Sequence, residues 1–324
     1  MKQEKEELLT IFHQILSNNV LGDKQYDSRY KGFVGELAFQ EWSKNKLESK
    51  FYSGGYFMPI EVGVRSIINP VYFTVSSEKP HEYNDIYTLL SQLPCREMYF
   101  IQWDKKIPFL EWQESADLLL NNVIKIPQFT VFKFDDITKN FIVSNFDIFL
   151  KNFAIKTKRT RSFPIPENMK KDWLIKLSNF SYELLLDLYV DRLIFDAFIG
   201  YSRSHGIPSD IDSIVYSTKQ NKYSLLEIKE KDLSKRAPQG FGMDVERIND
   251  LEMLSNQTTM SIYYVVRQID NQKNRNFLAW KSINLKNFIN NLPDKTIQGG
   301  SGMGFQNAQY PTKVCPIEYF KTFE

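Results

Sequence analysis

Two short apolar segments joined by a polar turn limit most strongly what this chain can fold into. Residues 211–217 (IDSIVYS) and 223–230 (YSLLEIKE) are rich in β-branched and apolar residues, and the segment TKQNK lies between them. This pattern predicts a β-hairpin. Leu225, Leu226 and Ile228 indicate that the second strand is buried on both faces, where an ionised side chain is costly unless it has a function.

Three ionisable side chains lie near one end of this hairpin. Side chains alternate along a strand, so Glu227 and Lys229 point to the same side and Ile228 to the other. Asp212 on the first strand can meet Glu227 if the register allows. Two adjacent carboxylates repel each other, and Mg²⁺, which prefers oxygen ligands and keeps several waters, relieves that repulsion. Since an ammonium beside a metal-bound water can orient it, this group suits metal-dependent phosphodiester hydrolysis.

These residues carry a family resemblance. The segment Ser209-Asp210-Ile211-Asp212, followed after fourteen residues by Glu227-Ile228-Lys229, resembles the active-site motif of the PD-(D/E)xK nuclease superfamily. The resemblance covers chiefly residues 171–285. It implies an α/β fold with a restriction-endonuclease-like core, in which a central mixed β-sheet is flanked by helices. The alternative is a surface hairpin with an exposed Glu–Lys pair.

The order of the elements around the hairpin matches the same core. Residues 171–200 form the leading helix in this interpretation, 240–257 the helix after the hairpin, and 260–268 the following strand. An N-terminal mixed α/β domain precedes the core. There we expect a helix over 112–123 and a glycine-rich loop at 53–56, which lacks the context of a phosphate-binding loop.

The resemblance implies roles for individual residues. The catalytic residues are Asp212, Glu227 and Lys229, and one or two Mg²⁺ ions are held by Asp212, Glu227 and the backbone carbonyl of Ile228. Asp212 fits the metal-binding aspartate better than Asp210, which remains a possible auxiliary residue.

Some members of the superfamily add an acid from the leading helix. Glu183 is a candidate, in a stripe with Asp187 and Asp191, although such a stripe is also typical of a solvated helix face. Glu36, in Gly35-Glu36-Leu37, resembles the same glutamate. Its distance in sequence from Asp212 favours a role in N-terminal architecture instead.

The chain divides into two expected domains. Residues 1–155 form an N-terminal α/β domain for DNA recognition or dimerisation, and 156–324 form the nuclease domain. The boundary lies near 151–170, where a cluster of cations precedes Pro164 and Pro166. The second part carries a net positive charge, which weakly favours a polyanionic partner. No internal repeat is visible in the sequence.

The expected function is a Mg²⁺-dependent endonuclease that cuts double-stranded DNA, with a type II restriction endonuclease as the specific interpretation and a homodimer as the working form. A repair or structure-specific nuclease, or a non-catalytic nucleic-acid-binding protein that retains the fold, are the alternatives. Cations after the motif are expected to contact the DNA backbone, namely Lys231, Lys235, Arg236 and Arg247. A Gly- and amide-rich segment, 298–310, could contact bases or be a plain surface loop.

Composition excludes several other classes of protein. With 42% hydrophobic and 25% charged residues, the chain is neither disordered nor a disulfide scaffold. The most apolar stretch, 184–199, is interrupted by charges, so no membrane span is expected. The N-terminus lacks an apolar signal core, and Cys95 and Cys315 have no partner spacing, which together favour a cytoplasmic protein with reduced thiols.

Overall fold

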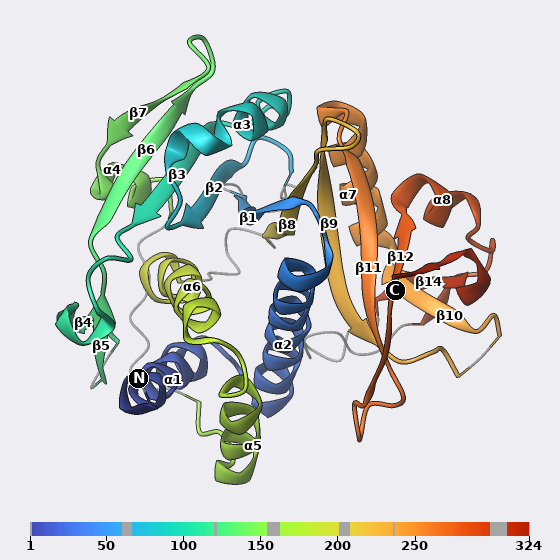
Figure 1. The fold of residues 1–324 in the computed structure, drawn as a ribbon, viewed down its shortest axis with the longest axis horizontal. Coiled ribbons are helices and arrows are strands. Elements are labelled where there is room, and N and C mark those ends of the chain that lie inside the picture. The colour runs from blue at the N-terminus through green and yellow to red at the C-terminus, as the bar shows by residue number, and fades with distance from the viewer. Residues whose placement is uncertain are drawn as a thin grey trace. The chain divides into compact units, whose positions relative to one another are not determined.

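The fold is described from a computed structural model, in which residues 2–59, 67–119, 122–153, 163–200, 208–235, 237–298 and 310–323 are placed. The chain forms two compact units (Figure 1). Unit 1 comprises Met1–Asp27 and Gly55–Asp210, and unit 2 comprises Ser28–Gly54 and Ile211–Glu324. This division does not follow the expected boundary near residue 155, and the cations proposed there, at 156–161, lie outside the described residues.

Unit 1 contains a mixed β-sheet in the order β1-β2-β3-β6-β7, with β2 and β3 parallel and the other neighbours antiparallel. Helix α3 covers one face, where Tyr87 packs on Tyr72 and Phe100. Helix α4 covers the other, where Phe149 packs on Phe73 and Tyr99. Its elements are α1 (Lys2–Asn18), β1 (Lys50–Met58, from Gly55 on), β2 (Val71–Ser76), η1 (Pro80–Tyr83), α3 (Asn84–Leu90), β3 (Glu97–Trp103), η2 (Phe109–Glu111), β4 (Gln113–Leu119), β5 (Asn122–Ile126), β6 (Phe129–Asp135), β7 (Asn140–Ser144), α4 (Phe146–Leu150), α5 (Glu167–Leu177), α6 (Tyr182–Arg192) and the π-helix η3 (Leu193–Ile199).

The strand pairing within unit 2 is also mixed: β8 and β9 form the predicted antiparallel hairpin, and β11 lies parallel to β9. Strands β12 and β15 extend it antiparallel. The elements are α2 (Asp23–Lys46, from Ser28 on), the first part of β1, β8 (Ser209–Ser217, from Ile211 on), β9 (Lys222–Lys231), β10 (Gly240–Asp244), α7 (Val245–Thr258), β11 (Ser261–Ile269), β12 (Phe277–Asn284), α8 (Leu285–Asn290), β13 (Ile297–Gln298), β14 (Pro311–Pro316), η5 (Ile317–Tyr319) and β15 (Lys321–Phe323).

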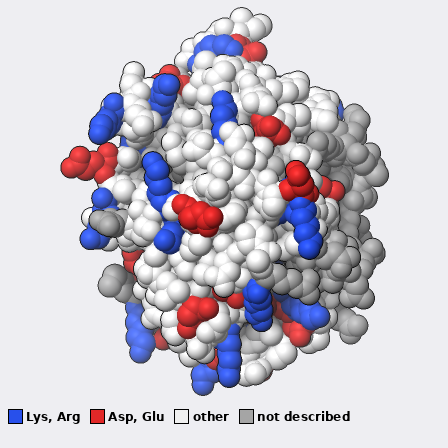
Figure 2. Space-filling view, turned by 90° about the vertical axis from the view of Figure 1, so that its right-hand side faces the viewer, with Lys and Arg blue, Asp and Glu red and all other residues white. Residues whose placement is uncertain are grey.

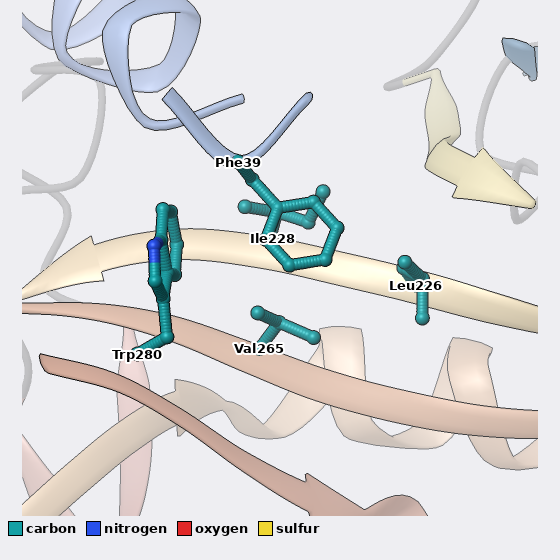
Figure 3. Packing of buried hydrophobic residues seen from close by; sticks show 5 residues of the cluster. All are labelled: Phe39, Leu226, Ile228, Val265 and Trp280. Carbon is teal, nitrogen blue, oxygen red and sulfur yellow. The ribbon is translucent and has the colours of Figure 1, made fainter. Parts of the chain in front are cut away.

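Helices cover both faces of the unit 2 sheet. Phe39 of α2 packs on Ile228 of β9 together with Val265 and Trp280 (Figure 3). Glu227, which points to the opposite face, contacts Arg247 of α7. The expected α/β class with a mixed sheet flanked by helices is therefore confirmed, while a restriction-endonuclease-like core stays a prediction.

Both units repeat one pattern of strand pairing. In each, an antiparallel hairpin is followed by a helical crossover to a parallel strand and then by two more antiparallel strands. The crossover helix is α3 in unit 1 and α7 in unit 2. This topological repeat is not visible in the sequence, because the corresponding strands contain different residues.

Three predicted helices differ from the structure. Within residues 112–123, expected as a helix, Gln113–Leu119 form β4 and residues 122–123 begin β5, because Gln113 pairs with Ile126 and Ile124 is fully buried. The predicted helix 171–200 is divided into α5, α6 and η3, since the Ser181 hydroxyl accepts a hydrogen bond from the Leu184 N–H and starts a new helix. The predicted helix 240–257 begins only at Val245, after β10.

The glycine-rich segment 53–56 is part of strand β1 and is not a loop. Glycine is required there because two backbones approach closely. A Cβ on Gly54 would lie 1.6 Å from the carbonyl oxygen of Ile211 on β8. In the same place, the Ser213 hydroxyl donates to the Tyr52 carbonyl at 3.2 Å, so the first part of β1 lies directly beside β8.

We expect Gly54→Ala to lower the free energy of unfolding by about 2 kcal/mol or more, because the added methyl group forces the β1 and β8 backbones apart. The measurement is urea unfolding followed by circular dichroism. Gly22→Ala is the matched control, since nothing lies within 4 Å of a Cβ at Gly22 and its backbone does not require glycine. Equal unfolding midpoints for the two variants would contradict the close approach.

Candidate functional site

The hairpin register brings Asp212 and Glu227 together in unit 2. Ser213 pairs with Leu226, and continuing the register by one residue sets Asp212 opposite Glu227. The Asp212 carboxylate also accepts a hydrogen bond from the Ile228 N–H, with 2.5 Å between Oδ2 and the nitrogen. This bond fixes the Asp212 side chain against the strand that carries the Glu-x-Lys segment.

Lys229 joins the two carboxylates. Its ammonium nitrogen lies 3.3 Å from Asp212 Oδ2 and 3.1 Å from Glu227 Oε1. Both acidic side chains are 2% exposed, whereas the Lys229 side chain is 38% exposed. The group therefore has two buried anions and a cation that reaches solvent, and the three predicted catalytic side chains converge.

A second cation, Arg247, pairs with Glu227. Arg247 lies in the first turns of α7, and its guanidinium Nη2 donates to Glu227 Oε2. Burial of Glu227 raises its pKa, but the charges of Arg247 and Lys229 outweigh burial and hold the pKa of Glu227 below its ordinary value. Glu227 is thus a carboxylate at neutral pH. Arg247, expected to contact DNA, contacts this carboxylate instead.

The donor set at this position fits a hard divalent cation. Two carboxylates are buried beside each other and pair with side-chain cations and with the Ile228 N–H, and the Ile228 backbone directly follows Glu227 in the chain. Across the described residues no group of three or more His, Cys, Asp or Glu side chains is placed to hold a metal. Any ion at Asp212 and Glu227 would therefore complete its shell with backbone oxygen, water or substrate.

The predicted DNA-contacting cations have different surroundings. Burial lowers the pKa of Lys231, at the end of β9, against the opposing effect of Asp244. Lys235 is exposed, and Arg236 lies outside the described residues. On the face drawn in Figure 2, Lys and Arg are dispersed among Asp and Glu without a continuous basic patch. Lys235 is therefore available to a ligand from solvent. The face in Figure 2 has no continuous basic surface for a DNA duplex.

Asp210 and Glu183 belong to unit 1, whereas the triad of Asp212, Glu227 and Lys229 belongs to unit 2. Glu183 is exposed in the first turn of α6. Asp210 acts electrostatically on Asp191 and Tyr56. Since Asp212 is the aspartate that contacts Lys229, it is the better candidate of the two for a metal ligand.

Asp191, the partly buried acid of the helical stripe, lies in a charged cluster of unit 1. The Tyr56 hydroxyl donates to Asp191, and Arg192 Nε donates to Asp196 at 2.8 Å. Burial, with smaller contributions from the charges of Asp196 and Asp210, raises the pKa of Asp191 to about 6 although Arg192 opposes the shift. Each charged group of this cluster has a partner within it or on a neighbouring polar side chain, which is typical of a structural network.

Sequence reasoning gave too little weight to α2. Helix α2 from Ser28 onward, with the first part of β1, belongs to the unit that contains Asp212 and Glu227. A Cβ at Gly35 would lie 3.6 Å from the Glu230 side chain, one residue beyond Lys229. Glu36 therefore lies on a helix of the same unit as the triad, and its distance in sequence from Asp212 does not separate it from this unit. The sequence signal for this packing was Gly35, since a glycine within a helix often marks close contact with a neighbouring element.

Unit 1 has no counterpart of the triad. Counted from the first paired residues of the parallel ladders, Val71 and Ser224, the positions of Glu227 and Lys229 correspond to Thr74 and Ser76. Neither residue is acidic or basic, so among the described residues the triad occurs once in the chain.

Comparisons with protein-family models, with curated proteins and with solved structures found no match. The chemistry of the site therefore rests on the geometry described above. No described helix has the length and apolar character needed to cross a membrane. Most of the Gly- and amide-rich segment, 299–309, lies outside the described residues.

We expect Asp191→Asn to stabilise the protein by about 1 kcal/mol at pH 7, since each unit of pKa shift corresponds to about 1.4 kcal/mol and the side chain is 26% exposed. The pKa of the folded state is raised, so the stability linked to Asp191 is present below its ordinary pKa and is lost as pH rises through about 6. The gain should shrink from pH 7 to pH 4 in thermal unfolding experiments. A variant equally destabilised at both pH values would contradict this assignment.

Proposed function

We propose that this chain is a Mg²⁺-dependent endonuclease that hydrolyses phosphodiester bonds of double-stranded DNA. The observation that carries the proposal is the contact of one partly exposed ammonium, Lys229, with two buried carboxylates, Asp212 and Glu227, on adjacent strands. The resemblance of their spacing to the PD-(D/E)xK motif supports the same assignment. Burial of two carboxylates opposite each other on adjacent strands is not expected for a plain surface hairpin.

Each residue has a distinct role in this proposal. Asp212, Glu227 and the Ile228 carbonyl would hold one or two Mg²⁺ ions, and the bound metal supplies Lewis-acid activation of the scissile phosphate and of water. Lys229 reaches solvent from between the carboxylates, so its ammonium can orient the attacking water and stabilise negative charge that develops on the phosphoryl oxygens. The Ile228 N–H holds Asp212 in position during these events.

The substrate assignment depends on the surroundings of the site. Lys231, Lys235, Arg236 and Arg247 follow the Glu-x-Lys segment and are proposed to bind the DNA backbone, which positions the duplex without reading its sequence. A type II restriction endonuclease that acts as a homodimer is the specific form of the proposal. A repair or structure-specific nuclease would use the same triad on a different DNA structure.

Lys229→Ala should lower the rate of plasmid cleavage in Mg²⁺ by about 100-fold or more, because it removes one preorganised charge from the transition state. Duplex affinity, measured by fluorescence anisotropy, should change little. Lys286→Ala, an exposed lysine in the first turn of α8, is the matched control and should cleave like the unmodified protein.

The products separate the alternatives. Discrete fragments from a plasmid support sequence-specific restriction, and a smear supports a nonspecific or repair nuclease. Duplex binding with no cleavage in Mg²⁺ or Mn²⁺ would overturn the enzymatic proposal and favour a non-catalytic binding protein.

Since the triad occurs once among the described residues, a double-strand break needs two chains or two successive events. We expect open-circular plasmid to accumulate before linear plasmid at low protein concentration, and the linear fraction to rise with protein concentration as dimers form. Gel analysis of time courses checks this. Linear product that forms first at every concentration, from a protein that sediments as a monomer, would contradict it.

A further inference from the structure

In the folded chain, the carboxylates of the triad are already paired with cations and a backbone N–H. Both oxygens of Glu227 are engaged, Oε1 by the Lys229 ammonium at 3.1 Å and Oε2 by the Arg247 guanidinium. Asp212 Oδ2 is engaged by Lys229 and by the Ile228 N–H. Two carboxylates thus face two side-chain cations, and the charges of these four groups balance.

A divalent cation cannot simply be added to this arrangement. It would meet Lys229 and Arg247 at short range, and Glu227 Oε2 is occupied by Arg247. Lys229 is needed in place for the proposed chemistry, whereas Arg247 has no proposed role that requires the Glu227 contact. Arg247 is the cation whose departure exposes a metal-binding oxygen.

Arg247 is well placed to leave. Its side chain is 17% exposed and arises from the first turns of α7, not from the strands that carry the carboxylates. A guanidinium forms paired hydrogen bonds with phosphate as readily as with carboxylate. A DNA phosphate arriving at the site could therefore take Arg247 from Glu227, and this exchange leaves Arg247 paired with an anion throughout.

We propose that Arg247 is a positioning residue that couples metal binding to duplex binding. In the absence of DNA its guanidinium occupies Glu227 Oε2, and when DNA binds it moves to a backbone phosphate. This inference rests on the proposed nuclease function. Because coupling between two ligands is reciprocal, DNA tightens metal binding by the same factor as metal tightens DNA binding. This coupling would keep the site inactive until a DNA substrate is bound.

The first measurement is Mn²⁺ affinity without DNA, by isothermal titration calorimetry on the full chain. Arg247→Met should bind Mn²⁺ about tenfold more tightly than the unmodified protein, since it frees Glu227 Oε2 without adding charge. Arg247→Lys keeps a cation to protect folding and should give an intermediate affinity. Lys286→Ala, remote in sequence and exposed, should leave the affinity unchanged.

The second measurement is the affinity for a fluorescently labelled duplex of mixed sequence, with and without Ca²⁺. The unmodified protein should bind the duplex roughly 5- to 150-fold more tightly in Ca²⁺, the usual range for coupled sites. In Arg247→Met this gain should be largely lost. A structural role of Arg247 alone would lower stability without changing the gain.

The outcomes distinguish this inference from the proposed function. If plasmid is cleaved but Arg247→Met and Arg247→Lys bind Mn²⁺ no more tightly than the unmodified protein, the coupling role is wrong and the nuclease proposal stands. If the unmodified protein neither binds Mn²⁺ nor cleaves DNA, both are wrong. Tighter Mn²⁺ binding by Arg247→Met together with loss of the Ca²⁺ gain supports the inference.

Discussion

The site depends on the pairing of two buried carboxylates, Asp212 and Glu227, with the ammonium of Lys229. Taking an ionised carboxylate out of water costs several kcal/mol, which only close opposite charges and hydrogen bonds recover. The β8–β9 hairpin makes this possible because its register brings the acids opposite each other and its Ile228 N–H holds Asp212.

The sheet that carries the triad is assembled from distant parts of the sequence. Unit 2 takes α2 and the first part of β1 from residues 28–54, and everything else from residue 211 onward. Phe39 of α2 closes the apolar face of β9, while Gly54 lets β1 approach the backbone of β8. Residues 55–210 lie in the sequence between two neighbouring strands of unit 2 and form unit 1 together with residues 1–27. Unit 1 repeats the strand-pairing pattern of unit 2 without a counterpart of the triad among the described residues.

The part of the site that lies within one short stretch of sequence, the hairpin, could be predicted from the sequence. The hairpin and the convergence of its charged side chains follow from alternation and from a turn of a few residues, so Asp212, Glu227 and Lys229 could be found without a structure. The association of α2 with this hairpin could not, because more than 150 residues of sequence separate Glu36 from Asp212 and no local pattern encodes a discontinuous unit. The contact of Arg247 with Glu227 was missed for a related reason. From the sequence alone, a cation on a helix after the motif can equally well face solvent, bind a phosphate or pair with a carboxylate. The position of the helix, which the sequence does not give, decides among these.

The error at residues 112–123 has a similar origin. Helix-favouring residues suggested a helix, but pairing of Gln113 with Ile126 and burial of Ile124 stabilise a hairpin that only tertiary packing selects. Conversely, Gly54 and Gly55 suggested a loop because glycine is common in loops, whereas the close approach of neighbouring backbones requires glycine within a strand. In both cases a neighbouring segment, invisible to a local pattern, decided the structure.

The central claim is that Asp212 and Glu227 hold one common metal ion. Anomalous X-ray scattering from crystals of the protein grown with duplex DNA and Mn²⁺, collected at the manganese edge, tests it most directly. We predict an anomalous peak within bonding distance of an oxygen of each carboxylate. A well-ordered site with DNA bound but no such peak, or a peak ligated by other residues alone, would contradict it.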